Sequence, residues 1–289
     1  PVFADAGRAL PAEDATDGWD WPKLSSSARA KLDTVRRLVE LDETRRARSA
    51  YGAIRDSVEK AVPESKRRAF MAFIGAQVED YTRGWELVSG GVSAMSGRMP
   101  DPNDVDWQLA YPRAYRPLVA SLAKRFDFPE LFVYAIMLQE SRFKPYQVSS
   151  ADAVGALQMI PSTAEQVAAE LGLSYDRHSF PDPRVGFAYS VFYMKKQHAL
   201  LHNLTFTAGA YNGGPHRIGP WALREQGKTL DFVVEEFAFD ESRHYARKVA
   251  EHLLRYVYLY ASDADERARI VDGLFPVDVD FEIGPDWGY

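Results

Sequence analysis

The chain has no cysteine among its 289 residues. This absence excludes disulfide bonds, thiol catalysis, zinc sites built on thiolates and a lipid-modified cysteine within this chain. Long apolar runs are also missing, since none approaches the roughly 20 residues that a membrane-spanning helix needs. Basic residues are not in excess, because the formal net charge is -6. We therefore expect no membrane span and no nucleic-acid partner.

What is present resembles an ordinary soluble protein, with 46% hydrophobic and 26% charged residues. The length allows one large domain or two smaller ones. The chain begins at Pro1 rather than at methionine. We therefore expect that an upstream segment, a signal peptide, precedes this sequence.

The first third of the chain shows helical periodicity. Apolar residues recur at helical spacing in "SSSARAKLDTVRRLVEL", and two further amphipathic stretches follow before residue 89. Short helices of this kind are typical of paired helices stacked as a small solenoid, so we expect a scaffold here. The stretch rich in Gly, Ser and Pro over residues 89–107 predicts a linker.

The remainder of the chain is also predicted to be helical. An apolar helix should end at Glu140, and "PSTAEQVAAELG" predicts a helix with a capping box of Ser162 and Glu165 and a stop at Gly172. We expect "NGGPHRIGP" to form a turn-rich loop and "PVDVDFEIGPDWGY" to be extended. Strand signals are few, and the predicted fold class is mainly α.

Glu140 is in an unusual place for a carboxylate. It ends the apolar run "PELFVYAIMLQ", where both the helix dipole and burial disfavour the charged form. The carboxyl group is therefore either protonated or paired with a cation, for which Arg142 and Lys144 are candidates.

Other chemistries find less support. No serine lies in a nucleophile elbow, and no glycine-rich phosphate loop with its lysine is present. His198 and His202 have the spacing of a zinc-binding helix, but Ala199 stands where the glutamate of that motif belongs. We interpret the two histidines as surface residues of an amphipathic helix and expect neither a metal nor a cofactor.

Four motifs occur in order: "QESRFKP", "GALQMIPSTA", "GAYNGGPHRIGPW" and "FVVEEFAFDESRHYARKV". In this order they resemble the soluble lytic transglycosylases, bacterial enzymes that cleave peptidoglycan with a goose-lysozyme-like catalytic domain. The resemblance covers residues 107–262. It implies a helical, superhelix-like region with its linker over residues 1–106 and leaves residues 263–289 as an extended C-terminal tail.

The resemblance also implies roles for single residues. Glu140 matches the single catalytic acid, and Ser141 matches the structural residue beside it. The substrate-binding residues that it implies are Ser149 near the acid, Gly155 and Gln158 at the glycan groove, Tyr211 beside the acid with its supporting Asn212, Glu235 at the sugar next to the scissile bond, and the groove tyrosine Tyr245.

The sequence departs from the family at several positions. Ala156 and Leu157 replace a common leucine and methionine, Asp152 and Gly186 replace a glycine and an asparagine, and Ala238 replaces a proline. None of these changes removes the acid, so we expect an active enzyme whose groove differs in fine shape.

The resemblance implies a lytic transglycosylase that cleaves the β-1,4 bond between N-acetylmuramic acid and N-acetylglucosamine and leaves 1,6-anhydro ends. Two alternatives stay open: a hydrolysing goose-type lysozyme and a catalytically idle glycan-binding scaffold of the envelope. The expected partners are peptidoglycan strands and cell-envelope proteins that bind the N-terminal helices. The expected location is the periplasm or cell envelope of a bacterium.

Overall fold

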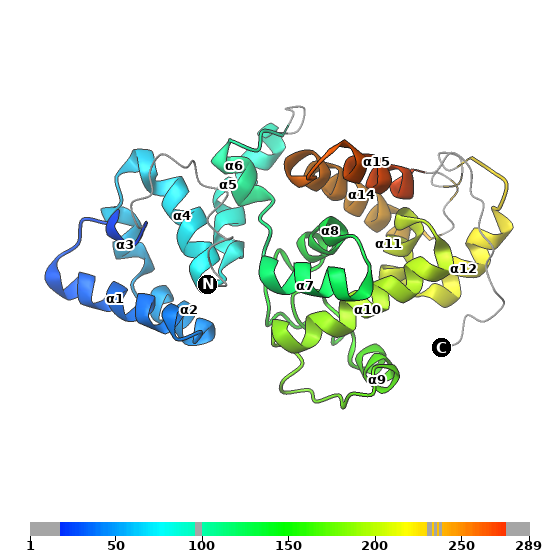
Figure 1. Cartoon of the computed structure of the whole chain (residues 1–289), viewed down its shortest axis with the longest axis horizontal. Helices are drawn as coiled ribbons and strands as arrows, with labels where there is room; N and C mark the ends of the chain where they lie inside the picture. Colours follow the sequence, from blue (N-terminus) through cyan, green and yellow to red (C-terminus); the bar gives the residue numbers. More distant parts are fainter. Residues whose placement is uncertain (1–17, 96–99, 230–232, 234–235, 237–238, 276–289) are drawn as a thin grey trace. The chain divides into compact units, whose positions relative to one another are not determined.

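The computed structural model describes residues 18–95, 100–229, 233, 236 and 239–275, and this part of the chain is built from helices (Figure 1). No strand forms within these residues. Isolated bridges pair Val154 with Val148 and with Met159. The prediction of a mainly α fold is confirmed.

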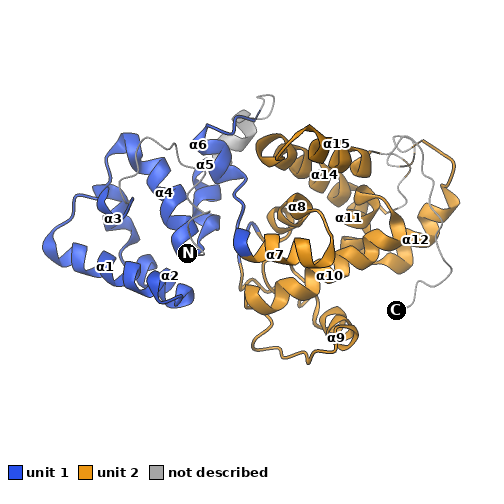
Figure 2. Ribbon diagram, viewed as in Figure 1, with its two compact units in different colours: residues 1–117, 142–144 blue, residues 118–141, 145–289 orange. Residues whose placement is uncertain are grey.

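The chain divides into two compact units (Figure 2). Unit 1 comprises residues 1–117 and 142–144, and unit 2 comprises residues 118–141 and 145–289. The division falls after residue 117, later than the predicted boundary at 106. The predicted linker over 89–107 was wrong in part, because one helix continues to Met95 and another begins at Val105.

Unit 1 contains short amphipathic helices that bury one face each. Leu32, Val35 and Phe70 are fully buried in its core. Helix α1 packs against α2, and α4 packs against α2, α5 and α6. The elements are η2 (Gly18–Asp20), α1 (Ser26–Glu40), α2 (Thr44–Gly52), α3 (Arg55–Ala61), α4 (Glu64–Val78), α5 (Tyr81–Met95) and α6 (Val105–Ala110).

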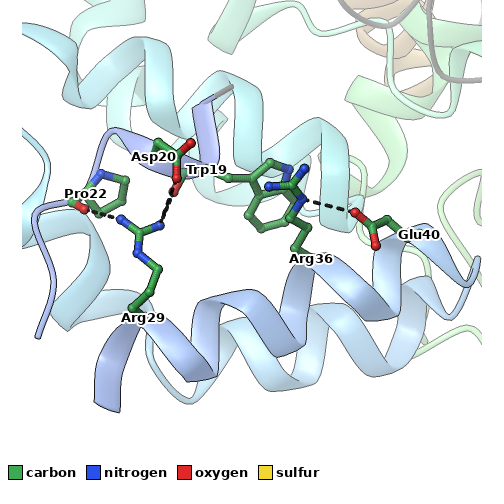
Figure 3. Close-up of polar contacts among 6 residues, drawn as sticks. All are labelled: Trp19, Asp20, Pro22, Arg29, Arg36 and Glu40. Atoms are coloured by element: carbon green, nitrogen blue, oxygen red, sulfur yellow. Dashed lines mark hydrogen bonds and ion pairs between the residues drawn. The ribbon is translucent and has the colours of Figure 1, made fainter. Parts of the chain in front are cut away.

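Arg29 on α1 holds the segment that precedes this helix (Figure 3). Its guanidinium donates hydrogen bonds to the carbonyl oxygens of Trp19 at 2.6 Å and Pro22 at 2.7 Å, and it lies 3.5 Å from the carboxylate of Asp20. These bonds to backbone carbonyl oxygens fix how the chain enters α1.

Unit 2 is built around a buried helix. Helix α8 is buried on all sides from Leu131 to Leu138, and α14 packs against both α8 and α11. Helix α10 packs against α9 and α11. The helices are α7 (Arg116–Phe126, which begins at the boundary), α8 (Glu130–Ser141), α9 (Pro161–Glu170), α10 (Pro183–Leu201), α11 (Leu204–Gly213), α12 (Pro215–Arg224), α14 (Asp240–Tyr260) and α15 (Ala264–Leu274).

Two predicted helix boundaries need correction. The capping box at Ser162 was wrong, because α9 begins at Pro161 and its N-cap Ile160 makes no side-chain bond, whereas Gly172 follows the helix with φ +67° as expected. The predicted loop "NGGPHRIGP" is also wrong. Gly214, with φ +84°, makes one sharp break, and Pro215 then opens α12, since a first helical turn accepts proline.

The predicted extended tail over 263–289 is wrong for its first part. Asp263 caps helix α15 by accepting a hydrogen bond from the backbone nitrogen of Glu266 at 2.8 Å. Residues 276–289 lie outside the described residues. Within the described residues, every helix is too short or too polar to cross a bilayer.

Candidate active site

Glu140 lies in the last turn of α8 and faces a tyrosine from α14. The hydroxyl of Tyr245 donates a hydrogen bond of 2.6 Å to Oε1 of Glu140. The two residues are distant in sequence and meet because α14 packs along α8, where the rings of Tyr134 and Tyr256 lie 5.5 Å apart. The helix pair therefore sets the position of the carboxyl group.

Burial raises the pKa of Glu140 to about 7, and the hydrogen bond from Tyr245 opposes this rise. Glu140 is partly exposed as a residue, and its carboxyl group is desolvated enough to raise the pKa. A cation paired with Glu140 would lower its pKa instead. Arg142 extends over the ring of Trp85, with 4.5 Å between the guanidinium carbon and the ring centroid. Of the two predicted states of Glu140, the geometry favours the protonated acid.

A loop over residues 147–159 is fixed to the helices around the acid through its carbonyl groups. Ser141 donates a hydrogen bond of 2.7 Å to the carbonyl of Ala156, and the hydroxyl of Tyr211 donates one of 2.7 Å to that of Leu157. Burial raises the pKa of Tyr211 well above its usual value, and the charge of Glu140 adds to the rise. Tyr211 is thus close enough to sense Glu140, but the direct donor to the acid is Tyr245.

Three predicted substrate-binding residues brace this loop internally. The hydroxyl of Ser149 accepts hydrogen bonds from the backbone nitrogens of Ala151 at 3.2 Å and Ala153 at 3.0 Å. Gly155 adopts φ +86°, a conformation that side chains rarely allow. The side-chain amide of Gln158 donates to the carbonyl oxygens of Gln147 and of Gly155, at 3.1 and 2.8 Å.

Asn212 connects α11 to α14. Its Oδ1 accepts a hydrogen bond of 2.9 Å from the hydroxyl of Ser242. A Cβ at the next residue, Gly213, would lie 2.4 Å from that hydroxyl, so only glycine allows this approach. Ser242 was missed by the sequence reasoning, although it lies in the motif "SRHYARKV". Glu235 lies outside the described residues, and its predicted role stays a prediction.

Two other positions do not join this site. Asp152, with φ +61°, is exposed and pairs with Arg177 at 3.7 Å. His198 is half-buried rather than on the surface, and its Nδ1 lies 3.3 Å from the hydroxyl of Thr207. Burial lowers the pKa of His198 to about 4. In the described part of the chain, no three His, Asp or Glu side chains gather as a metal site would require.

The arrangement of a carboxyl with a raised pKa at a helix end, a tyrosine donor and a braced loop coincides with a sequence match. Residues 117–231 match the family model described as the transglycosylase SLT domain. This stretch of the chain is similar to an SLT domain. The soluble lytic murein transglycosylase of Escherichia coli is 29% identical over 155 residues, which is 51% of this chain and 24% of that protein.

Solved structures extend the likeness in fold beyond the SLT domain. The 70 kDa soluble lytic transglycosylase of Escherichia coli matches with a TM-score of 0.61 at 21% identity, over 85% of this chain and 38% of that chain. An inactive mutant of the lytic transglycosylase Slt from Pseudomonas aeruginosa matches with a TM-score of 0.55 at 21% identity, over 88% of this chain and 38% of that chain. The chain spans about a quarter of the length of the curated relatives that it matches.

Proposed function

We propose that the chain is a peptidoglycan lytic transglycosylase in which Glu140 acts first as an acid and then as a base. The observation that carries this proposal is the pKa of about 7 that burial gives the carboxyl of Glu140. A group with this pKa can donate a proton and take one back near neutral pH. The SLT match over residues 117–231 and the lytic transglycosylases among the relatives support the same substrate class.

The first step is protonation of the glycosidic oxygen by Glu140. The bond from that oxygen to C1 of N-acetylmuramic acid breaks, and the sugar's own N-acetyl oxygen stabilises the positive charge at C1. This substrate-assisted route replaces the second carboxylate of an ordinary retaining glycosidase. In the described residues, the pKa of Glu140 responds to burial and to Tyr245 and not to a second carboxylate.

The second step uses Glu140 as the base. Its carboxylate takes the proton from the C6 hydroxyl of the same sugar, whose oxygen attacks C1 and closes a 1,6-anhydro ring. No water is consumed, and the enzyme regains its starting protonation state. The attack is intramolecular and gains from proximity, so it outruns hydrolysis where the groove excludes water. Tyr245 holds Oε1 in place through both steps.

Product analysis tests this proposal. Purified sacculi are digested, and the muropeptides are analysed by mass spectrometry before and after borohydride treatment. We expect 1,6-anhydro ends, one water lighter than lysozyme products and not reducible by borohydride. Reducing ends would show a hydrolysing goose-type lysozyme instead, and an absence of any digestion would leave a glycan-binding scaffold.

The proposal extends to the setting of the enzyme. Its substrate places it in the periplasm or cell envelope of a bacterium, with glycan strands as the partner. Glu235 is proposed to contact the sugar next to the scissile bond. The helices of unit 1 are proposed to bind other envelope proteins.

A further inference from the structure

The residues directly after the catalytic acid belong to unit 1. The chain of unit 2 runs to Ser141, residues 142–144 join unit 1, and unit 2 resumes at Pro145. Arg142 and Phe143 both adopt left-handed backbone conformations, with φ +54° and +69°. Such conformations are unfavourable for residues with a side chain and persist only where surrounding contacts fix them.

Helix α5 supplies those contacts. Thr82 donates a hydrogen bond of 2.9 Å from its hydroxyl to the carbonyl oxygen of Arg142. The ring of Trp85 lies under the guanidinium of Arg142 at 4.5 Å. Phe143 is fully buried, and its ring lies edge-on to that of Tyr81 with 6.4 Å between centroids. One turn of α5 therefore fixes both strained residues.

Tyr81 is itself anchored. Its hydroxyl accepts a hydrogen bond of 3.2 Å from the backbone nitrogen of Tyr115, and the two rings lie 5.2 Å apart. Ser141, on the other side of the turn, donates to the carbonyl of Ala156 at 2.7 Å. The chain that leaves Glu140 is thus held at consecutive residues, first by the loop of unit 2 and then by α5.

We propose that α5 is a positioning element for catalysis, and that Thr82 and Trp85 set the placement of Glu140 through the strained turn at Arg142 and Phe143. This inference rests on the proposed function of Glu140. If α5 released the turn, the last residues of α8 would gain freedom. A misplacement of about 1 Å at a catalytic group can cost on the order of a hundredfold in rate.

The test uses full-length variants. Thr82→Val removes the hydroxyl at nearly constant shape, Thr82→Ser restores it, and Trp85→Leu removes the ring under Arg142. The matched control is Thr34→Val on α1, because the hydroxyl of Thr34 also donates to a backbone carbonyl, that of Ala30 at 2.9 Å. The kcat and KM values are measured on soluble peptidoglycan fragments, and thermal unfolding is followed in parallel.

We expect Thr82→Val and Trp85→Leu to lower kcat by roughly tenfold with KM within twofold, since a lost hydrogen bond of this kind is worth about one factor of ten. Thr82→Ser and Thr34→Val should keep the wild-type kcat. A kcat within twofold of wild type in both test variants overturns the inference. A drop that merely follows a fall in Tm, or that Thr82→Ser fails to rescue, overturns it as well.

A second readout separates this inference from the proposed function. The carboxyl of Glu140 is titrated by 13C NMR in each variant, which requires no turnover. Among the described residues, the titratable group that acts on the pKa of Glu140 is Tyr245 on α14, and the charge of Glu140 in turn raises the pKa values of Tyr245 and of Tyr211 on α11. We expect its pKa to fall below that of the wild type in Thr82→Val and Trp85→Leu, because water gains access. If the wild type releases no anhydro products, the proposed function is refuted. Independently of that result, an unchanged pKa of Glu140 in both variants overturns the inference about α5.

Discussion

At Glu140, the environment that suits the chemistry works against the stability of the fold. Burial raises its pKa from 4.5 to about 7. The raised value means that the folded protein holds this proton more tightly than the unfolded chain does. Below pH 4.5, Glu140 is protonated in both states and does not lower the free energy of unfolding. As the pH rises from 4.5 through about 7, the unfolded chain releases this proton more readily, and the free energy of unfolding falls.

We therefore expect Glu140→Gln to lose digestion of sacculi by at least a hundredfold, since acid catalysis contributes about 10²–10⁴-fold. The same variant should be more stable than the wild type at pH 8, by roughly 3 kcal/mol or less, and equal to it at pH 4. Denaturant unfolding at the two pH values measures this difference.

Glu130→Gln is the matched control for that variant. Glu130 lies on the same helix, and its carboxylate also accepts a hydrogen bond from a tyrosine, Tyr134, at 2.9 Å. It lies at the N-terminal end of α8, where a negative charge is favourable. The control should keep its activity and gain no stability at pH 8. Equal gains in stability in the two variants would contradict the interpretation that the negative charge of Glu140 destabilises the fold.

Tyr245 allows a test of the direction in which a hydrogen bond shifts the pKa of Glu140. Its hydrogen bond lowers the pKa of Glu140, so Tyr245→Phe should raise that pKa above about 7. In the proposed mechanism the activity depends on the protonated acid, so the alkaline limb of the pH–rate profile should move to higher pH while the maximal rate falls. Tyr134→Phe removes a hydroxyl from α8, the helix that carries Glu140, and should leave the alkaline limb of the pH–rate profile unchanged. A shift to lower pH in Tyr245→Phe would contradict this arrangement.

The sequence was most informative for residues whose chemistry conflicts with their local pattern. Glu140 stood out because an apolar helix rarely ends on a carboxylate. The pairing of Tyr245 with Glu140 could not be predicted, because it depends on how α14 packs along α8. The partners of Ser149 could not be predicted either, since its hydroxyl accepts hydrogen bonds from loop amides and these depend on the fold of the loop.

At the scale of helices, boundaries set by a single backbone conformation escaped prediction. The composition of "NGGPHRIGP" favours a loop, yet one glycine with positive φ and one proline suffice to end α11 and begin α12. The first part of the tail was mispredicted because Asp263 caps a helix, α15, that also buries Ile270 and Leu274.

Gly186 shows how a departure from a family pattern can be imposed by packing. A Cβ at this position in α10 would lie 2.5 Å from the carbonyl oxygen of Phe180. We expect Gly186→Ala to destabilise the protein by about 1–3 kcal/mol, because backbone must move to relieve the clash. Gly52→Ala is the control, since a Cβ there meets nothing within 4 Å and a helix gains up to about 1 kcal/mol from the exchange. Thermal unfolding of both variants tests the difference, and equal Tm values would refute it.

At the scale of the whole molecule, the predicted domain boundary can be tested directly. A fragment that begins at Asp106 lacks α5 and so lacks Tyr81, against which the fully buried Phe143 packs. Exposing a phenylalanine costs about 1.5–3 kcal/mol. We expect this fragment to melt roughly 5 °C or more below the full chain, as measured by circular dichroism. A fragment as stable and as active as the full chain would show that residues 142–144 do not need α5.

Because residues 142–144 belong to unit 1, they also limit where this chain can be joined to another protein in a chimera. A chimera joined between residues 96 and 117 would carry the strained turn into a new host and leave behind the helix turn at Tyr81–Trp85 that holds it. The smallest segment that is transferable with its acid intact therefore starts before Tyr81. With the proposed role of α5, the segment needed for activity is longer than the stretch 117–231 that matches the SLT domain model.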